Sequence, residues 1–255
     1  MSRRSSGRGI VGQRIVVTRA RNQSESLITA LTQVGAIPIS FPTIQHQQMR
    51  DLREVDAGIR AALDADWVVF TSANGVRAVA DRVAITMEDR WRPQRIAAVG
   101  PVTASALGQL ALVANLIPGE YHGGALAAAL GKVSGLSIVL LRASAAQPTL
   151  ANDLRSAGAE VLDVPVYRTE MIEPDQGALD ELGQGVDVVT FTSSSTVHGF
   201  VSALGAGGRS LTDSAIVATI GPITTATAIS LGMSVEVEAT ESTTDGLIQA
   251  LVGHF

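Results

Sequence analysis

The second half of this 255-residue chain repeats the first. Residues 15–44 align with residues 138–167 at a constant offset, which pairs Arg19 with Arg142 and Leu27 with Leu150. Three later segments pair at a slightly shorter offset: FTSANGV (70–76) with FTSSSTV (191–197), VGPVTA (99–104) with IGPITT (220–225), and ALAAAL (125–130) with GLIQAL (246–251). The shared order indicates two copies of one unit of about 120 residues, the length of a domain rather than of a solenoid repeat.

Each copy opens with a strand and a helix. In the first copy an apolar strand is predicted at 14–18. The helix that follows presents Leu27 and Leu31 on one face and ends at Gly35, a residue type that favours the turn after a helix.

The same alternation continues along both copies. Further strands are predicted at 66–70 and 95–99, with a helix beginning at Thr71–Ser72 after the first and a helix capped near Thr103 after the second. The second copy repeats this order, with strands at 137–141, 186–191 and 215–220, a helix at about 149–156 and an extended run at 161–171. Strands alternating with helices predict an α/β fold with two similar, doubly wound parallel-sheet domains.

Two proline-containing runs, around Pro42 and Pro165, occupy equivalent places in the copies. Proline cannot donate a backbone hydrogen bond, so such runs belong at a sheet edge or between domains. With both runs as linkers, we expect a discontinuous first domain of residues 14–36 plus 173–255 and a second domain of residues 46–160. The linker strands are then 37–45 and 161–172, and residues 1–13 form a disordered tail.

Charge and hydropathy exclude several classes of protein. The formal net charge of −5 argues against a nucleic-acid or anionic-membrane partner. No apolar run approaches the ~20 residues of a membrane span, and the basic N-terminal segment lacks the apolar stretch of a signal peptide. We therefore expect a cytoplasmic protein.

The residue inventory offers no recognisable set of metal ligands. The chain has no cysteine, which excludes thiolate catalysis and cysteine-ligated metals. The histidines have no second histidine or carboxylate at metal-motif spacing, so we expect surface or half-buried side chains at His46, His122, His198 and His254. Neither glycine-rich nucleotide-binding fingerprint occurs.

Polar residues collect where the predicted strands end, which is where doubly wound sheets bind ligands. Hydroxyl and backbone N–H groups at helix N-termini bind carboxylates. Serine and threonine also serve simply as helix caps, and arginines at strand ends are often solvated. Their presence in both copies favours binding, so the predicted substrate-binding residues are Arg19, Ser72, Ala73, Asn74, Thr103, Arg142, Ser193, Ser194, Ser195, Thr224 and Thr225.

Tyr167 marks a difference between the copies. The first copy has PTI at 42–44, whereas the second has PVYRT at 165–169. Tyr167 lies at the end of an extended run, near the predicted meeting point of the domains, where a phenol can donate a proton or hydrogen bond to a ligand. The alternative is an aromatic side chain that packs the linker with its hydroxyl in water.

The ordered set of motifs resembles uroporphyrinogen-III synthases. VYRT (166–169), FTSxxxV, [VI]GPxT and TTDGL (243–247) match that family in order, spacing and total length, over roughly residues 14–251. One departure is the loop at 143–147, ASAAQ, where bacterial members often carry a glycine and further basic residues.

The resemblance implies two α/β domains joined by a two-stranded linker, with the active site in the cleft between them. Enzymes of this family convert hydroxymethylbilane, a linear tetrapyrrole with acetate and propionate on every ring, into uroporphyrinogen III. Water is lost and the last pyrrole is inverted, without a metal or organic cofactor. The resemblance also implies a monomer, and a transient contact with the enzyme that produces hydroxymethylbilane.

The implied catalysis works mainly by positioning. Loss of the hydroxyl gives an azafulvene that cyclises unaided without inversion, so the enzyme must direct attack to the substituted α-carbon of the terminal ring through a spiro intermediate. By resemblance, Tyr167 corresponds to the family tyrosine proposed to assist departure of the hydroxyl. Five residues match positions expected to hold carboxylates, partly through main-chain amides: Ser72, Thr103, Ser193, Thr224 and Thr225.

Two other functions stay open from the residues themselves. A non-enzymatic two-domain binding protein of the solute-receptor type has the same architecture, but the missing signal peptide counts against it. A flavodoxin-like nucleotide or flavin protein needs a phosphate loop richer in Gly, Ser and Thr than Thr18–Arg19–Ala20.

Overall fold

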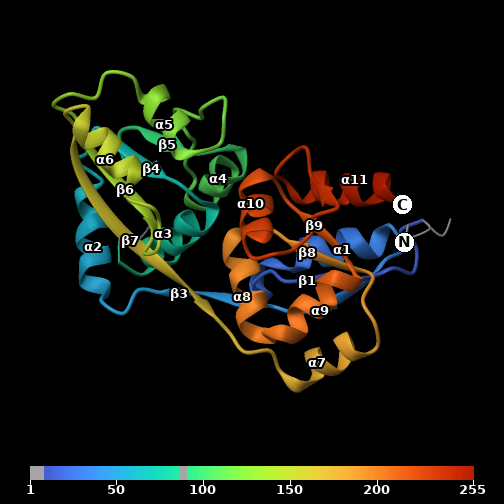
Figure 1. Ribbon diagram of the computed structural model, residues 1–255. Helices are drawn as coiled ribbons and strands as arrows, with labels where there is room; N and C mark the ends of the chain where they lie inside the picture. The colour runs from blue at the N-terminus through green and yellow to red at the C-terminus, as the bar shows by residue number, and fades with distance from the viewer. Residues whose placement is uncertain (1–8, 87–90) are drawn as a thin grey trace. The chain divides into compact units, whose positions relative to one another are not determined.

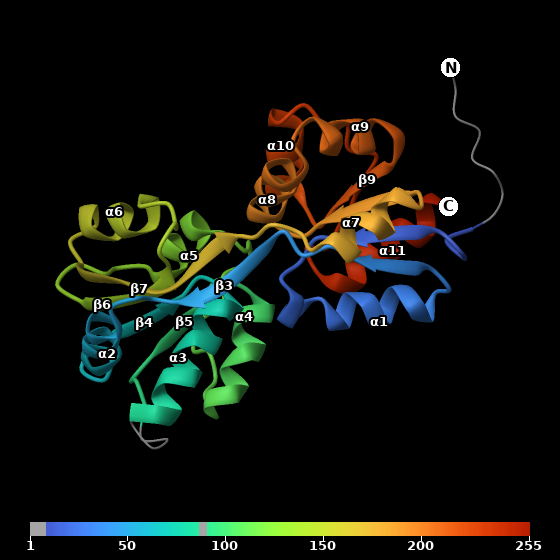
Figure 2. The ribbon, with the colours of Figure 1, turned by 90° about the horizontal axis from the view of Figure 1, so that it is seen from below.

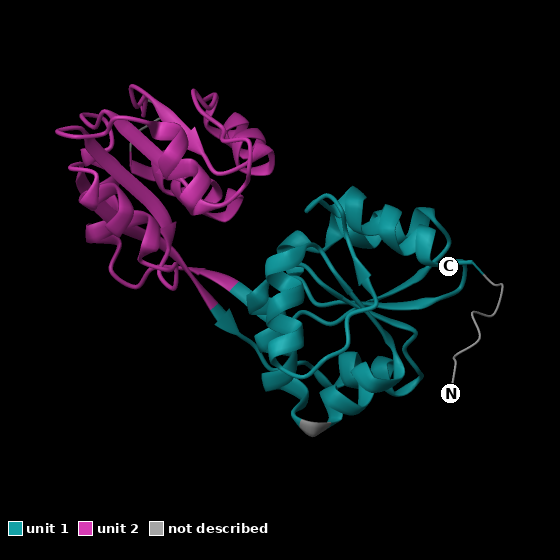
Figure 3. Ribbon diagram, turned by 45° about the horizontal axis from the view of Figure 1, so that its top comes forward, with its two compact units in different colours: residues 1–45, 170–255 teal, residues 46–169 magenta. Residues whose placement is uncertain are grey.

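The computed structural model describes residues 9–86 and 91–255 of the chain (Figure 1). Internal packing divides these residues into two compact units (Figure 3). Unit 1 comprises the described residues up to Gln45 together with residues 170–255, and unit 2 comprises residues 46–169. The predicted α/β class, with two sheets dominated by parallel strands, is confirmed.

Unit 1 is built on a sheet with the strand order β10-β9-β8-β1-β2, in which every neighbouring pair is parallel. Pro38 lies on β2, the edge strand, where a residue without an N–H leaves no neighbouring strand unpaired. The strands are β1 (Arg14–Val17), β2 (Ile37–Ser40), β8 (Val188–Phe191), β9 (Ile216–Thr219) and β10 (Val237–Glu238).

Helices cover both faces of the unit 1 sheet (Figure 2). The odd-numbered side chains of β1, such as Ile15, pack with α1 (Glu25–Gln33) and α11 (Thr244–His254). The intervening Val16 faces the opposite cluster, because successive side chains of a strand point to opposite faces. That face is covered by α7 (Gln176–Gly183), α8 (Ser194–Leu204), α9 (Ala206–Ser214) and α10 (Pro222–Ser230), while the short 3₁₀ helix η1 (Arg21–Gln23) precedes α1.

Unit 2 has the strand order β3-β7-β6-β4-β5. Its strands are β3 (Ile44–Gln48), β4 (Trp67–Phe70), β5 (Ile96–Ala98), β6 (Ser137–Ala143) and β7 (Glu160–Met171). One face is covered by α2 (Leu52–Ala61), α3 (Ala73–Thr86), α4 (Pro101–Ala106) and the 3₁₀ helix η2 (Leu107–Leu110), and the other by α5 (Gly123–Leu130) and α6 (Thr149–Ser156).

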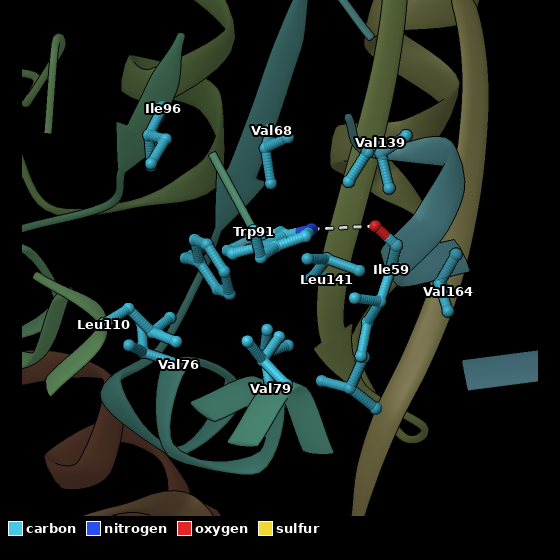
Figure 4. Close-up of a cluster of buried hydrophobic side chains, with 14 of the residues drawn as sticks. Ile59, Val68, Val76, Val79, Trp91, Ile96, Leu110, Val139, Leu141 and Val164 are labelled. Carbon is cyan, nitrogen blue, oxygen red and sulfur yellow. Dashed lines mark hydrogen bonds between the residues drawn. The ribbon is translucent and has the colours of Figure 1, made fainter. Parts of the chain in front are cut away.

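The core of unit 2 under α2 and α3 is arranged around Trp91 (Figure 4). The indole is fully buried, and its Nε1–H donates to the carbonyl of Ile59 at 2.8 Å. Its ring meets that of Phe70 edge to face. A buried indole N–H needs such a partner, so Trp91 fixes the end of α2 to the sheet.

A β-bulge interrupts the pairing of β6 with β7. Arg142 pairs with Pro165, but the next residue, Ala143, pairs with Tyr167, so Val166 is the extra residue. Val166 and Tyr167 consequently both pack into the core under α2 and α3, whereas consecutive residues of a regular strand face opposite sides. Proline inside a sheet is tolerated at such irregularities.

The two segments that connect the units run side by side as β3 and β7. Ile172 N donates to the Thr43 carbonyl at 3.1 Å, and Arg168 Nε donates to the Gln48 carbonyl at 3.3 Å. The rest of each proline-containing run belongs to a sheet: β2 pairs with β1, and β7 pairs with β6 from Glu160 onward.

Two local expectations need correction. Gly100, not Thr103, is the N-cap of α4, and Thr103 is the third residue of that helix. Residues 1–8 of the expected tail lie outside the described residues, but Ile10 is buried in the unit 1 core and Gly12 N donates to the Gly35 carbonyl at 2.7 Å. Within the described part of the chain, no helix is long and apolar enough to cross a membrane.

Candidate functional site

Tyr167 is held at the polar edge of the unit 2 sheet by the bulge in β7 and the N-terminus of α3. Its side chain is 8% exposed, and its hydroxyl oxygen lies 3.0 Å from the Ser72 hydroxyl oxygen. Ser72 Oγ also accepts the backbone N–H of Gly75 at 3.1 Å, so it caps α3 as well. Burial, which outweighs hydrogen bonds from Ser72 and Asn74, raises the pKa of Tyr167, so the phenol is a protonated donor at neutral pH.

Two further side chains surround Tyr167, and one of them was not predicted. Asn74, the second residue of α3, bonds to His46 of β3, with 3.0 Å between Asn74 Nδ2 and His46 Nε2. The other ring nitrogen of His46 lies 3.1 Å from Thr169 Oγ1, and the His46 ring meets that of Tyr167 edge to face. The expectation of a half-buried His46 is confirmed, but its place in this cluster was missed.

The internal repeat contains a signal that points to His46. His46 and Thr169 are 123 residues apart, the offset that aligns the first thirty residues of the two copies. They are therefore equivalent positions that contact each other: His46 lies four residues after Pro42, and Thr169 lies four residues after Pro165.

The other predicted residues of unit 2 lie at the same edge of the sheet. Ala73 is the first residue of α3 and is half-buried. Thr103 is 4% exposed in the first turn of α4, which follows β5. Ala73 follows β4, Thr103 follows β5, and Arg142 lies near the end of β6. Because these three strands are parallel, the residues lie at the same edge of the sheet.

Arg142 is bound within unit 2. Its guanidinium forms a two-pronged ion pair with Asp163, and its Nη1 donates to the Gln147 carbonyl at 2.5 Å. The Arg142 side chain is 6% exposed and that of Asp163 28%. A buried arginine requires such a partner, so the pair accounts for Arg142 by itself.

In unit 1 the predicted residues also lie at the carboxyl edge of a parallel sheet. Arg19, which follows β1, is half-buried, and its Nη1 lies 3.2 Å from Thr244 Oγ1 at the start of α11. Ser193, which follows β8, caps α8 by accepting Thr196 N at 3.3 Å, and its hydroxyl lies 2.9 Å from that of Ser195.

Two further predicted hydroxyls of unit 1, those of Ser194 and Thr225, bond to the hydroxyls of neighbouring threonines. Ser194 Oγ lies 2.7 Å from Thr227 Oγ1, and Thr225 Oγ1 lies 2.6 Å from Thr219 Oγ1. Thr224 is the third residue of α10 and is 4% exposed, as Thr103 is in α4. The predicted residues of each unit thus lie at one edge of its sheet, and several of them also serve as caps.

A hollow in unit 2 lies away from these residues. It has a volume of about 460 Å³ and is lined partly by Ser137 and Glu160, the first residues of β6 and β7. Ligands of parallel sheets bind at the carboxyl ends, so we place the candidate site at Tyr167 and not in this hollow. Among the described residues, no group of three or more His, Asp or Glu side chains is arranged to hold a metal ion.

Comparison with known proteins identifies the family. A family model for uroporphyrinogen-III synthase HemD matches residues 25–249. The chain belongs to this family. A uroporphyrinogen-III synthase from Synechococcus elongatus is 32% identical over 252 residues, which cover 95% of each chain. A uroporphyrinogen-III synthase from Chlorobaculum parvum is 26% identical, over 88% of this chain and 91% of the relative.

Solved structures share the fold of this family member. A mutant uroporphyrinogen III synthase from Thermus thermophilus matches with a TM-score of 0.65 and 20% identity, over 93% of this chain and 96% of the other. A uroporphyrinogen-III synthetase from Helicobacter pylori matches with a TM-score of 0.63 and 12% identity, over 96% of this chain and 100% of the other. The family resemblance inferred from the motifs is therefore confirmed.

Proposed function

We propose that Tyr167 donates the hydrogen bond that assists loss of the hydroxyl group when this chain converts hydroxymethylbilane to uroporphyrinogen III. The observation that carries the proposal is the environment of the phenol: it is buried, protonated at neutral pH and bonded to Ser72 at the carboxyl edge of the sheet, where parallel sheets bind ligands. Positioned donors of this kind typically accelerate reactions ~10²- to 10⁴-fold.

The proposed step balances without a cofactor. The bond between the terminal methylene carbon and its hydroxyl oxygen breaks, and its electron pair leaves with the oxygen. Tyr167 transfers its proton to that oxygen, so that water departs, while the pyrrole nitrogen supplies electrons to the carbon and gives an azafulvenium cation. The pyrrole N–H proton then returns to the Tyr167 phenolate, which gives the neutral azafulvene and restores the phenol, and the oriented terminal ring closes through the spiro intermediate.

We propose that the polar edges of the two sheets bind the substrate carboxylates. Ser72, Ala73, Asn74 and Thr103 contribute from unit 2, and Ser193, Ser194, Ser195, Thr224 and Thr225 from unit 1. The support is their place at helix N-termini, where backbone N–H groups and the helix dipole favour anions, each worth ~0.3 to 1 kcal/mol. Such sites bind a polyanion despite the formal net charge of −5.

We assign a carboxylate contact to Arg19 and a supporting role to Arg142. The two are paired by the repeat, but their surroundings differ. Arg19 is half-buried beside Thr244, whereas the Arg142 guanidinium is almost fully buried against Asp163 and the Gln147 carbonyl.

We also infer a monomeric, cytoplasmic enzyme that contacts the producer of hydroxymethylbilane transiently. The support is chemical: hydroxymethylbilane cyclises unaided to the uninverted product, so a short transfer preserves it for this enzyme. The family membership supports hydroxymethylbilane as the small-molecule substrate.

The test is to supply the purified chain with enzymatically generated hydroxymethylbilane and to separate the type III and type I isomers. We expect type III to predominate, and type I alone in the reaction without the chain. Type I alone in both reactions would remove the proposed activity. An absorbance band of bound flavin would favour a flavodoxin-like protein, and tight binding of the bilane without turnover would favour a non-enzymatic binding protein.

A further inference from the structure

A chain of polar contacts leads from Tyr167 through Asn74 to His46. We propose that His46 is a positioning residue for the reaction: its neutral ring holds the Asn74 amide with the N–H groups toward Tyr167, which leaves the phenolic proton for the substrate. This inference rests on the proposed function of Tyr167.

Arg77 fixes which way the Asn74 amide points. A guanidinium can only donate, and Arg77 Nη1 lies 2.9 Å from Asn74 Oδ1. The amide nitrogen therefore points to the other side, where it lies 3.0 Å from His46 Nε2. Because an amide nitrogen can only donate, His46 Nε2 must accept, and it carries no proton.

The second ring nitrogen of His46 completes the arrangement. A neutral imidazole with an accepting Nε2 carries its proton on Nδ1. That nitrogen lies 3.1 Å from Thr169 Oγ1, which accepts the proton. The protein thus selects one of the two neutral tautomers of His46, with one partner on α3 and one on β7.

The same amide group controls the Tyr167 hydroxyl. The hydrogen bond from Asn74 favours the phenolate, as expected when Asn74 is the donor. Ser72 Oγ accepts from Gly75 N and has one proton of its own, which in the proposed arrangement it donates to the phenol oxygen 3.0 Å away. With Ser72 and Asn74 both donating to it, the phenol oxygen has its acceptor sites filled, and its proton points to the ligand side.

Protonation of His46 reverses this arrangement. An Nε2–H facing the Asn74 N–H groups is repulsive, and rotation of the amide relieves it by turning Oδ1 toward His46 and Tyr167. The phenol then donates to Asn74 instead of to the substrate, and the contact of Arg77 with Oδ1 is lost. Protonation of His46 thereby links the donor to pH.

Charged and titratable groups lie near His46 on β7 and on α3. From β7 these are Tyr167 and, next to Thr169 in the sequence, Arg168 and Glu170, which bond to the Gln48 carbonyl and to Gln45. From α3 there is Arg77, behind Asn74.

Two substitutions separate this role from a structural one. Gln at position 46 can place an amide oxygen where Nε2 accepts but cannot titrate, so His46→Gln should keep type III formation near the wild-type rate at pH 8. Leucine cannot accept a hydrogen bond, so His46→Leu should lower the rate of type III formation roughly tenfold or more. This loss is part of the ~10²- to 10⁴-fold acceleration that a positioned proton donor provides. His254→Gln, at an exposed position at the end of α11, is the matched control.

The deciding measurement is the rate of type III formation between pH 5.5 and 8.5. We expect the wild type and His254→Gln to lose rate as the pH falls and His46 becomes protonated, and His46→Gln to stay nearly constant. An unchanged acid limb in His46→Gln would overturn the inference while leaving the proposed function in place, whereas absence of type III from the wild type would overturn the function.

A measurement without turnover tests the same arrangement. Nitrogen-15 NMR of the imidazoles distinguishes the tautomers, and the His46 signals are identified by their absence from His46→Gln. We expect a proton on Nδ1 at pH 8. A proton on Nε2 would contradict the proposed orientation of Asn74.

Discussion

The hydroxyl oxygens of Ser72 and Tyr167 lie 3.0 Å apart, although 95 residues separate them in the sequence. The contact joins the N-terminus of α3 to the bulge of β7, so the proposed donor is held by two elements of the unit 2 core. The same serine hydroxyl caps α3 through Gly75 N.

Ser72→Ala should therefore raise the pKa of Tyr167 further, because the Ser72 hydrogen bond lowers it against the effect of burial. The chain has only two tyrosines, so in a Tyr121→Phe background the alkaline absorbance titration reports Tyr167 alone. Ser193→Ala, which removes the equivalent cap in unit 1, is the control and should leave the midpoint unchanged. Equal titration midpoints for Tyr121→Phe and for its combinations with Ser72→Ala and with Ser193→Ala would mean that Ser72 does not act on the phenol.

The paired arginines should respond differently to the same substitution. Arg142→Met leaves Asp163 without its partner in a mostly buried site and should lower the free energy of unfolding by about 3 kcal/mol. Arg19→Met should change stability little and raise the KM for hydroxymethylbilane. Urea denaturation and steady-state kinetics measure the two effects, and a raised KM with normal stability for Arg142→Met would reverse our assignment.

Much of the fold was accessible from the sequence because the repeat shows each local pattern twice. The strand that opens each copy, the helix ending at Gly35 and the Gly-Pro turns all follow from apolar periodicity and turn chemistry. Sheet topology placed Ser72 and Asn74 at the carboxyl edge, and the difference between the copies pointed to Tyr167; their roles toward a substrate stay predictions. The contacts of Ser72 and Asn74 with the Tyr167 hydroxyl were not predicted.

What escaped prediction depends on register and on distant partners. The bulge that turns Tyr167 into the core depends on how β7 pairs with β6, which local periodicity does not encode. Arg142 could not be separated from Arg19 because its partner, Asp163, lies on the neighbouring strand. His46 carries no motif, and only its equivalence to Thr169 marks it.

Trp91→Phe tests the core of unit 2. The phenylalanine ring retains much of the contact with Phe70, but the buried carbonyl of Ile59 loses its hydrogen bond, which typically costs about 1–3 kcal/mol. Urea unfolding followed by circular dichroism should show this loss. A change below about 0.5 kcal/mol, the range of neutral surface substitutions, would mean that the carbonyl finds another partner.

Unit 2 should lose stability in acid through the Asp56–Arg82 ion pair. The Arg82 guanidinium lowers the pKa of Asp56 below the value of about 3.9 for an unfolded aspartate. The folded state therefore binds fewer protons, so the contribution is present above about pH 4 and is lost as the pH falls through the folded-state pKa.

The matching variant is Asp56→Asn. It should be less stable than the wild type at pH 7, and the difference should shrink below about pH 4, where the native carboxylate is also neutralised. Both tryptophans, Trp67 and Trp91, belong to unit 2, so their fluorescence follows its unfolding. A stability difference that stays constant down to pH 2 would contradict the assigned cause.

The rate of type III formation by Tyr167→Phe, compared with Tyr121→Phe, tests the central claim most directly. Tyr121 is 59% exposed, so its substitution controls for the loss of a phenol hydroxyl. We expect a fall of ~10²- to 10⁴-fold for Tyr167→Phe and near wild-type turnover for Tyr121→Phe, with melting temperatures that change little because the Tyr167 ring keeps its packing. Near-normal type III formation by a folded Tyr167→Phe protein would contradict the account and leave Tyr167 as a packing residue.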